Sequence, residues 1–204
     1  MKRKTAILMA AASLSVAFLA GCSGDDNKPE EKETQVETTS GVDEVGHVTE
    51  EDGYKKVLEY INKDFNKSDE SGTFEFTIKS VRLESLTAST DVAARTYGVE
   101  KETESSVLTL DLSGINNGDR TVNCYISQAT LTTDKGVTVE PKALLGKYID
   151  GHFEYNVLKE GTNVYVFPGI KPSEINNLTF EVAAPKNNDF KEVGDPIELE
   201  FSLR

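Results

Sequence analysis

The chain has 204 residues, of which 35 are acidic and 22 are basic, and its formal net charge is −13. This acidic balance argues against nucleic acid as a partner, because binding nucleic acid depends on clustered Lys and Arg side chains that neutralise phosphates. It also disfavours direct adhesion of the protein to anionic lipid headgroups.

The first 21 residues have the layout of an export signal. Lys2, Arg3 and Lys4 form a basic start, and residues 5–18 form an apolar run without a charge. A membrane-spanning helix needs roughly 20 apolar residues, so this shorter run is more typical of a secretory signal. We therefore expect residues 1–21 to be removed on export.

A four-residue run, Leu19-Ala20-Gly21-Cys22, ends this segment and resembles the lipobox of bacterial lipoproteins. The resemblance implies that a peptidase cuts between Gly21 and Cys22 and that Cys22 carries a covalent diacylglycerol. Two acyl chains anchor a protein stably, whereas one chain does so only marginally. The expected location is the outer, extracytoplasmic face of a cell membrane, with membrane lipid as the partner of Cys22. Ordinary signal cleavage before an unmodified cysteine is the alternative.

The next segment, residues 22–52, is predicted to be an acidic, disordered tether behind the lipidated cysteine. Residues 23–52 contain 11 acidic and 2 basic side chains and few large apolar ones. Such a composition does not bury enough surface to fold. A calcium site is the sharper alternative, but no run matches the alternating Asp/Asn loop with a central Gly and a terminal Glu.

Residues 53–72 are predicted to form a short amphipathic helix and a connection. Apolar side chains recur at spacings of three and four from Tyr54 to Phe65, which is one stripe of a helix, and Asp52 precedes it as a candidate cap. We expect this helix to pack on the domain that follows. A docking helix for a protein partner is the alternative.

Residues 73–204 show the two-residue period of β-strands. The apolar phase slips by one residue at Lys79-Ser80, which predicts a β-bulge. Turn signals at residues 116–119 and 134–136 separate successive strands. Seven or eight short strands in about 130 residues predict a mainly β fold, an antiparallel sandwich.

The order of strands resembles the immunoglobulin-like, telokin-like domains of unknown function found in Gram-positive surface lipoproteins. The resemblance is carried by residues 108–120 (LTLDLSGINNGDR), 130–141 (TLTTDKGVTVEP) and 178–185 (LTFEVAAP). It implies an immunoglobulin-like sandwich on the cell surface. Its motifs include no catalytic residue, so it implies little about activity.

Two segments are candidates for function. Residues 143–155 concentrate Tyr148, His152, Phe153 and Tyr155 around a flexible Asp-Gly pair, and we treat these four side chains as a candidate recognition surface. The alternative is that their rings fill the sandwich core. The connection from residue 84 to 105 is long for a structureless loop, so it is functional, mobile or partly an additional strand.

The sequence contains no catalytic or metal-binding motif that we recognise. The 2 His residues, His47 and His152, lie in very different regions, so a zinc site is not expected. Lipidation of Cys22 leaves Cys124 without an intramolecular partner, and the apolar phase of its strand predicts a buried thiol. We expect no enzyme activity and no cofactor apart from the diacylglycerol on Cys22.

These observations predict a lipid-anchored binding lipoprotein whose ligand is a protein or a cell-envelope component. The alternative is an accessory lipoprotein of a transporter that handles a small molecule or a metal. An envelope hydrolase is a weaker possibility, since it requires an acid/base pair that only folding would bring together.

Overall fold

In the computed structural model the chain is mainly β, and residues 43–51 and 53–203 are described. Its strand ladders are antiparallel, as predicted. The elements in chain order are β1 (Val48–Glu51), β2 (Tyr54–Asn62), β3 (Lys67–Ser71), β4 (Phe74–Ala88), α1 (Asp91–Tyr97), β5 (Ser105–Asn116), β6 (Val122–Asn123), η1 (Ile126–Gln128), β7 (Thr130–Thr133), β8 (Thr138–Val139), β9 (His152–Phe153), β10 (Lys159–Phe167), η2 (Pro172–Glu174), β11 (Asn177–Val182) and β12 (Ile197–Ser202).

The larger of the sheets has six strands in the order β1-β2-β4-β5-β10, with β3 also paired to β4. Strand β4 is 15 residues long and pairs with three other strands of this sheet. One edge of β4 pairs with β3 and then β2, and its other edge pairs with β5 along its length. A second sheet has the order β12-β11-β7-β8, and β6 and β9 form a short ribbon.

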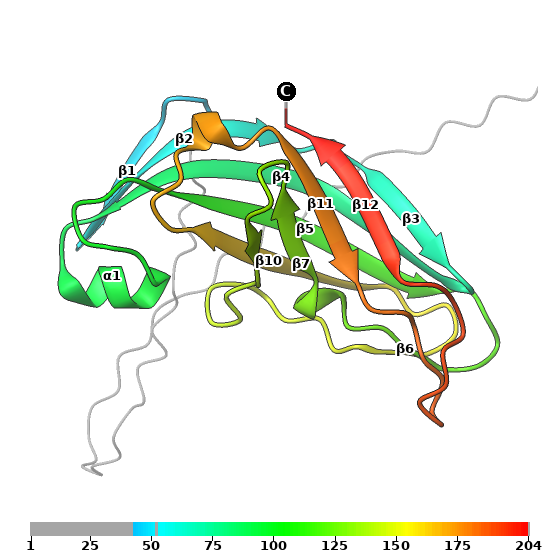
Figure 1. Cartoon of the computed structure of the whole chain (residues 1–204). Coiled ribbons are helices and arrows are strands. Elements are labelled where there is room, and N and C mark those ends of the chain that lie inside the picture. Colours follow the sequence, from blue (N-terminus) through cyan, green and yellow to red (C-terminus); the bar gives the residue numbers. More distant parts are fainter. Residues whose placement is uncertain (1–42, 52, 204) are drawn as a thin grey trace, which may run out of the picture. The chain divides into compact units, whose positions relative to one another are not determined.

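The main core lies between the two larger sheets. Figure 1 shows β7, β11 and β12 lying against the long strands β4 and β5. Phe76 of β4 stacks on Phe180 of β11, and Phe65 meets Phe201 of β12 edge to face, with 5.4 Å between ring centroids in both pairs. These contacts join the sheets face to face, which is the predicted sandwich arrangement.

The predicted bulge in β4 is confirmed. The register with β5 shifts between Ile78 and Ser80, so Lys79 is the additional residue. Ile78 and Val81, on either side of the shift, are both fully buried in the core. The bulge therefore keeps Ile78 before it and Val81 and Leu83 after it on the inner face, and turns Lys79 and Ser80 away from that face.

The predicted helix at residues 54–65 is wrong, because this segment is strand β2. A second bulge explains the misleading spacing: the register with β4 shifts between Leu58 and Tyr60. An additional residue brings two positions three apart onto one face, so Val57 shares a face with Tyr60 and Leu58 shares a face with Ile61. A bulged strand thus imitates the spacing of a helix.

The predicted boundaries at residues 52 and 72 are also wrong. Residues 48–51 form strand β1, which pairs with β2, so the end assigned to the disordered tether belongs to the folded domain. Residues 67–71, assigned to a connection, form β3. Charged side chains are tolerated in these strands because β1 and β3 pair through backbone groups and leave many side chains exposed.

The short helix of the fold lies within the segment from residue 84 to 105. Strand β4 runs on to Ala88, and α1 follows, with Thr90 as its N-cap and Gly98 in the left-handed conformation at its end. Tyr97 packs over a small apolar cluster on the outer face of the larger sheet, together with Val107 and Val166. Within the described residues, no helix is long and apolar enough to cross a membrane.

Candidate functional site

A row of polar side chains crosses the outer face of the six-stranded sheet. Ser80 of β4 pairs with Asp111 of β5, which pairs with Thr162 of β10. Lys147 adds a fourth position, because its backbone forms an isolated antiparallel bridge with Thr162. Paired residues in a ladder point to the same face, so the four side chains stand side by side.

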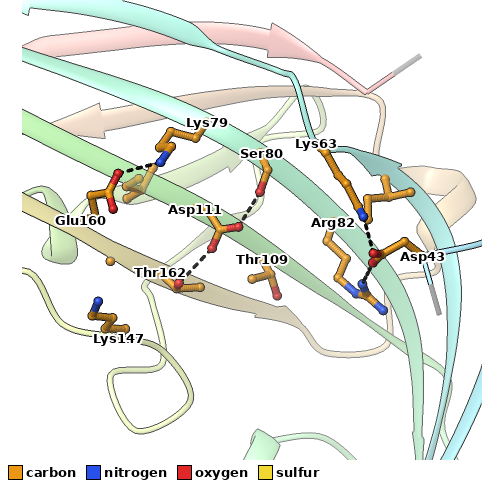
Figure 2. Close-up of a pocket in the computed structure, with 13 residues that line it drawn as sticks. Asp43, Lys63, Lys79, Ser80, Arg82, Thr109, Asp111, Lys147, Glu160 and Thr162 are labelled. Atoms are coloured by element: carbon orange, nitrogen blue, oxygen red, sulfur yellow. Dashed lines mark hydrogen bonds and ion pairs between the residues drawn. The ribbon is translucent and has the colours of Figure 1, made fainter. Parts of the chain in front are cut away.

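Asp111 is the centre of this row. Its Oδ2 accepts a hydrogen bond of 2.6 Å from the Ser80 hydroxyl, and its Oδ1 accepts one of 2.9 Å from the Thr162 hydroxyl. Figure 2 shows these two bonds converging on the carboxylate from both neighbouring strands. Each oxygen of Asp111 is therefore held in place by a side chain on an adjacent strand.

The bulge places Lys79 beside this row, where it meets Glu160 of β10. The Lys79 Nζ lies 2.6 Å from the Glu160 Oε1. This ion pair lowers the pKa of Glu160 below its usual value and raises the pKa of Lys79. Both side chains are therefore charged near neutral pH.

A second charged group lies at the other side of the site. Asp43, which precedes the first strand, contacts the Lys63 ammonium and lies 3.0 Å from the Arg82 Nη1. The hydrogen bond from Lys63 is the largest cause of the lowered pKa of Asp43. The Nε of Arg82 also lies 3.2 Å from the Oε1 of Glu84. Arg82 therefore joins Asp43 to the surface of the sheet.

These groups line a hollow of about 480 Å³ on the outer face of the sheet (Figure 2). Its lining comes from β2, β4, β5, β10 and the segments around residues 43 and 147. We call it the outer-face hollow, and its charged and hydroxyl side chains are Asp43, Lys63, Lys79, Ser80, Arg82, Thr109, Asp111, Lys147, Glu160 and Thr162. Ligand-binding pockets commonly have volumes of roughly 300–1,000 Å³. The volume of the hollow falls within this range.

The structure separates the four residues of the sequence-predicted recognition surface. Tyr148 and Tyr155 are 56% and 63% exposed, and His152 is also exposed, with its Nδ1 lying 3.0 Å from the Asn123 Oδ1. Phe153 is fully buried and packs edge to face on Phe74, so its assignment to the surface is wrong. The alternation of a strand explains this, since adjacent residues of β9 point to opposite faces.

Sequence reasoning did not identify the outer-face hollow. Its residues come from six separate segments, and most of these are brought together by pairing across strands. Two signals were nevertheless present: the phase slip at Lys79-Ser80, and the polar phase of β5 that carries Thr109 and Asp111. Those signals mark a polar face, while the register that aligns them with Thr162 is fixed by tertiary pairing.

The structure describes Cys124 but not Cys22. Cys22 and the cleavage position at Gly21 lie outside the described residues. Cys124 is 1% exposed in the main core, as predicted, and burial raises the pKa of its thiol to about 12. The described part of the chain contains no group of three or more His, Cys, Asp or Glu side chains placed to hold a metal ion.

Comparison with known proteins supports the lipoprotein interpretation. No family model matches the chain. A protein of Bacillus subtilis strain 168, the SPbeta prophage-derived uncharacterized lipoprotein YonS, is 27% identical over 174 residues, which are 84% of this chain and 77% of YonS. The chain is thus similar to a Bacillus lipoprotein.

One solved structure shares the fold at low sequence identity. A functionally unknown protein from Listeria monocytogenes EGD-e has a TM-score of 0.55 and 13% identity, over 73% of this chain and 88% of that one. A Bacillus subtilis protein described as a candidate lipoprotein, YcdA, has a TM-score of 0.46 and 14% identity, over 68% of this chain and 39% of that one. The first likeness concerns the fold alone, and we draw no argument from the second.

Proposed function

We propose that the protein is a lipid-anchored, extracytoplasmic binding lipoprotein and that the outer-face hollow is its binding site. The ligand in this proposal is a component of the cell envelope or a protein exposed there. The single observation that carries the proposal is the cross-strand row of Ser80, Asp111 and Thr162, continued by Lys147, on the face of the larger sheet opposite the core.

The lipoprotein features of the chain support an extracytoplasmic role. The run at residues 19–22 resembles a lipobox, and YonS, whose name describes it as a lipoprotein, matches most of the chain. In this proposal the diacylglycerol on Cys22 holds the domain at the membrane, and the acidic residues that follow separate the domain from the lipid surface. The immunoglobulin-like arrangement inferred from the sequence belongs to the same proposal.

The rigidity of the row supports recognition. A polar side chain contributes most to binding when its own position is fixed before the ligand arrives. The hydroxyls of Ser80 and Thr162 fix the Asp111 carboxylate, and Lys79 fixes Glu160. The three strands that carry these groups, β4, β5 and β10, are paired through their backbones, so this part of the lining is built before a ligand binds.

The lowered pKa of Glu160 favours binding over hydrolysis. A carboxylic acid that donates a proton in catalysis needs a pKa raised towards neutrality. The pKa of Glu160 is lowered by Lys79 instead. Glu160 therefore remains an ionised acceptor, which suits the recognition of a ligand better than the protonation of a leaving group.

Site-specific photocrosslinking in intact cells tests the assignment of the hollow. A photoreactive amino acid replaces Thr109, which lines the hollow, and in a matched control it replaces Glu198, an exposed residue of β12. We expect a discrete crosslinked species from position 109 that is absent from position 198. Equal crosslinking from both positions, or none from position 109, would contradict the assignment.

Substitution of Cys22 tests the anchor separately. Cys22→Ser removes the sulfur that would take the diacylglycerol, so we expect the protein to leave the membrane fraction on washing with high salt. A Cys124→Ser variant, which changes the buried cysteine, is the control and should stay in the membrane fraction. Retention of the Cys22→Ser protein after the wash would refute lipid anchoring through this residue.

A further inference from the structure

The side chains that line the outer-face hollow are less acidic than the chain as a whole. The chain has more acidic than basic residues, 35 against 22. The hollow is lined by four cationic side chains, Lys63, Lys79, Arg82 and Lys147, and by three carboxylates, Asp43, Asp111 and Glu160. Arg82 also pairs with Glu84 beside the hollow, so the site is close to neutral and repels an anionic ligand less than the acidic chain as a whole does.

The carboxylates of the hollow already have partners. Asp111 accepts hydrogen bonds from two hydroxyls, and Glu160 pairs with Lys79. Asp43 pairs with both Lys63 and Arg82. A cationic ligand would have to compete with these contacts for every carboxylate in the hollow.

Lys147 is different, because its charge is available. Among residues 43–51 and 53–203, its side chain makes no hydrogen bond or ion pair, although its charge lowers the pKa of Glu160. Its backbone is fixed by two hydrogen bonds with Thr162, of 3.0 Å from the Lys147 N–H and 2.9 Å to the Lys147 carbonyl. The Lys147 side chain therefore starts from a fixed backbone position at the hollow and keeps its ammonium free.

Two glycines make that position possible. A Cβ on Gly146 would lie 2.2 Å from the Thr162 carbonyl oxygen, and a Cβ on Gly161 would lie 2.3 Å from the Lys147 carbonyl oxygen. Any other residue at either position would force the two segments apart. The close approach of the Lys147 segment to β10 is thus a specific feature of this sequence.

Asp43 shows that Lys63 and Arg82 can bind a carboxylate. It belongs to no strand, and its carboxylate lies between the Lys63 ammonium and the Arg82 guanidinium. An ion pair between exposed side chains is weak, about 0.2–1 kcal/mol, so a ligand can displace it. In the absence of a ligand, the Asp43 carboxylate therefore pairs with the Lys63 and Arg82 side chains.

We infer that the ligand of the outer-face hollow carries carboxylate groups, that Lys147 receives one of them, and that Asp43 competes with another for Lys63 and Arg82. This inference rests on the proposed function of the hollow and names the chemistry of its ligand. Carboxylates of this kind occur in acidic peptides and in acidic sugars, and the probes below distinguish these two sources.

Isothermal titration of the full chain in detergent tests the inference with defined probes. Tetra-L-glutamate represents an acidic peptide, trigalacturonate represents an acidic sugar, and tetra-L-glutamine is the neutral match of the peptide. We expect at least one of the two acids to bind, with an affinity that falls as salt is raised, and the neutral peptide not to bind. The acid that binds more tightly identifies the source.

Variants assign the binding to the hollow. Lys147→Ala should weaken binding of the acidic probe about two- to fivefold, because it removes one ion pair with the probe, and Asp43→Asn should strengthen binding by a similar factor, because it removes the competing carboxylate. Lys191→Ala and Glu198→Gln make the same changes of charge on exposed side chains outside the hollow and should leave the affinity unchanged. A thermal melt of each variant verifies that it is folded.

Among the results in which a probe binds, three would overturn the inference. They are equal binding by the wild type and Lys147→Ala, weaker binding by Asp43→Asn, and tighter binding of tripolyphosphate than of either carboxylate probe. Absence of binding by both carboxylate probes, together with specific crosslinking from position 109, would refute the ligand chemistry while leaving the proposed function intact. Loss of the crosslink together with binding of a carboxylate probe in the hollow would refute the envelope role instead.

Discussion

Replacing Tyr165 with Phe tests the polar network inside the sandwich. Tyr165 of β10 is fully buried, and its hydroxyl donates a hydrogen bond of 3.0 Å to the Ala129 carbonyl oxygen. The same hydroxyl accepts a bond of 3.0 Å from the Asn163 Nδ2, which also donates to the Ile126 carbonyl oxygen at 2.9 Å. This network ties β10 to the segment that leads into β7, and so holds one side of the outer-face hollow in place.

The expected loss of stability comes from a buried carbonyl group that loses its hydrogen bond. Removing the hydroxyl leaves the Ala129 carbonyl without this bond, while Asn163 keeps its bond to Ile126. An unsatisfied buried acceptor costs about 1–3 kcal/mol. A loss of about 2 kcal/mol lowers the Tm of a domain of this size by about 4–8 °C.

Urea unfolding followed by circular dichroism measures this loss, and a thermal melt measures the change in Tm. Tyr155→Phe is the matched control, because Tyr155 is 63% exposed and removing its hydroxyl leaves no buried acceptor. We expect the control to stay within about 0.5 kcal/mol of the wild type. A change of similar size in both variants, or none in Tyr165→Phe, would refute the reasoning.

Three further predictions follow from contacts elsewhere in the fold. Gly114→Ala should lower the free energy of unfolding by about 1–3 kcal/mol, because a Cβ there would lie 3.0 Å from the Phe153 ring; a melting curve like that of the wild type would show that the core relaxes around it. The Cys124 thiol, whose pKa burial raises to about 12, should resist a thiol reagent in the native protein and react once urea unfolds it; rapid labelling without urea would contradict its burial. Because the pKa of Glu160 is lowered in the folded state, its pairing should stabilise the fold above the usual glutamate pKa of 4.5 and stop doing so as the pH falls through the lowered value, whereas the raised pKa of Lys79 places the opposite loss at alkaline pH. The Tm difference between the wild type and Glu160→Gln should close as the pH falls below 4.5, and a constant difference would refute the ion pair.

The two bulges show how far the sequence predicts this fold. In β4 the phase slip at Lys79-Ser80 interrupts a long alternating run, and the bulge was predicted from it. In β2 the shift falls within a nine-residue strand, so too few alternating positions remain on either side to reveal the two-residue period. The apparent period of three and four then predicts a helix, and tertiary pairing with β4 decides against it.

The residues at the two ends of the short helix α1 are sequence signals that predict a helix. Thr90 and Gly98 are the type of residues that begin and end a helix, and they bracket the seven residues of α1. Alternation predicted the buried position of Cys124 in the same way that it could have predicted that of Phe153, beside the exposed His152. Local patterns therefore predict which face a residue takes when the period is applied consistently.

The outer-face hollow depends on information that local patterns do not contain. Ser80, Asp111, Thr162 and Lys147 meet because four segments pair in one register, and the sequence does not reveal which strands are neighbours. The polar character of each position was visible, but its position in the row was not. Binding surfaces assembled across a sheet are for this reason harder to predict than motifs within one segment.

Photocrosslinking from position 109 in intact cells is the most direct test of the claim that the outer-face hollow is the binding site. We expect one discrete crosslinked partner from position 109, reduced when Lys147→Ala is introduced into the same protein and absent when the photoreactive residue is at position 198. A partner captured equally from both positions, and unaffected by Lys147→Ala, would contradict it.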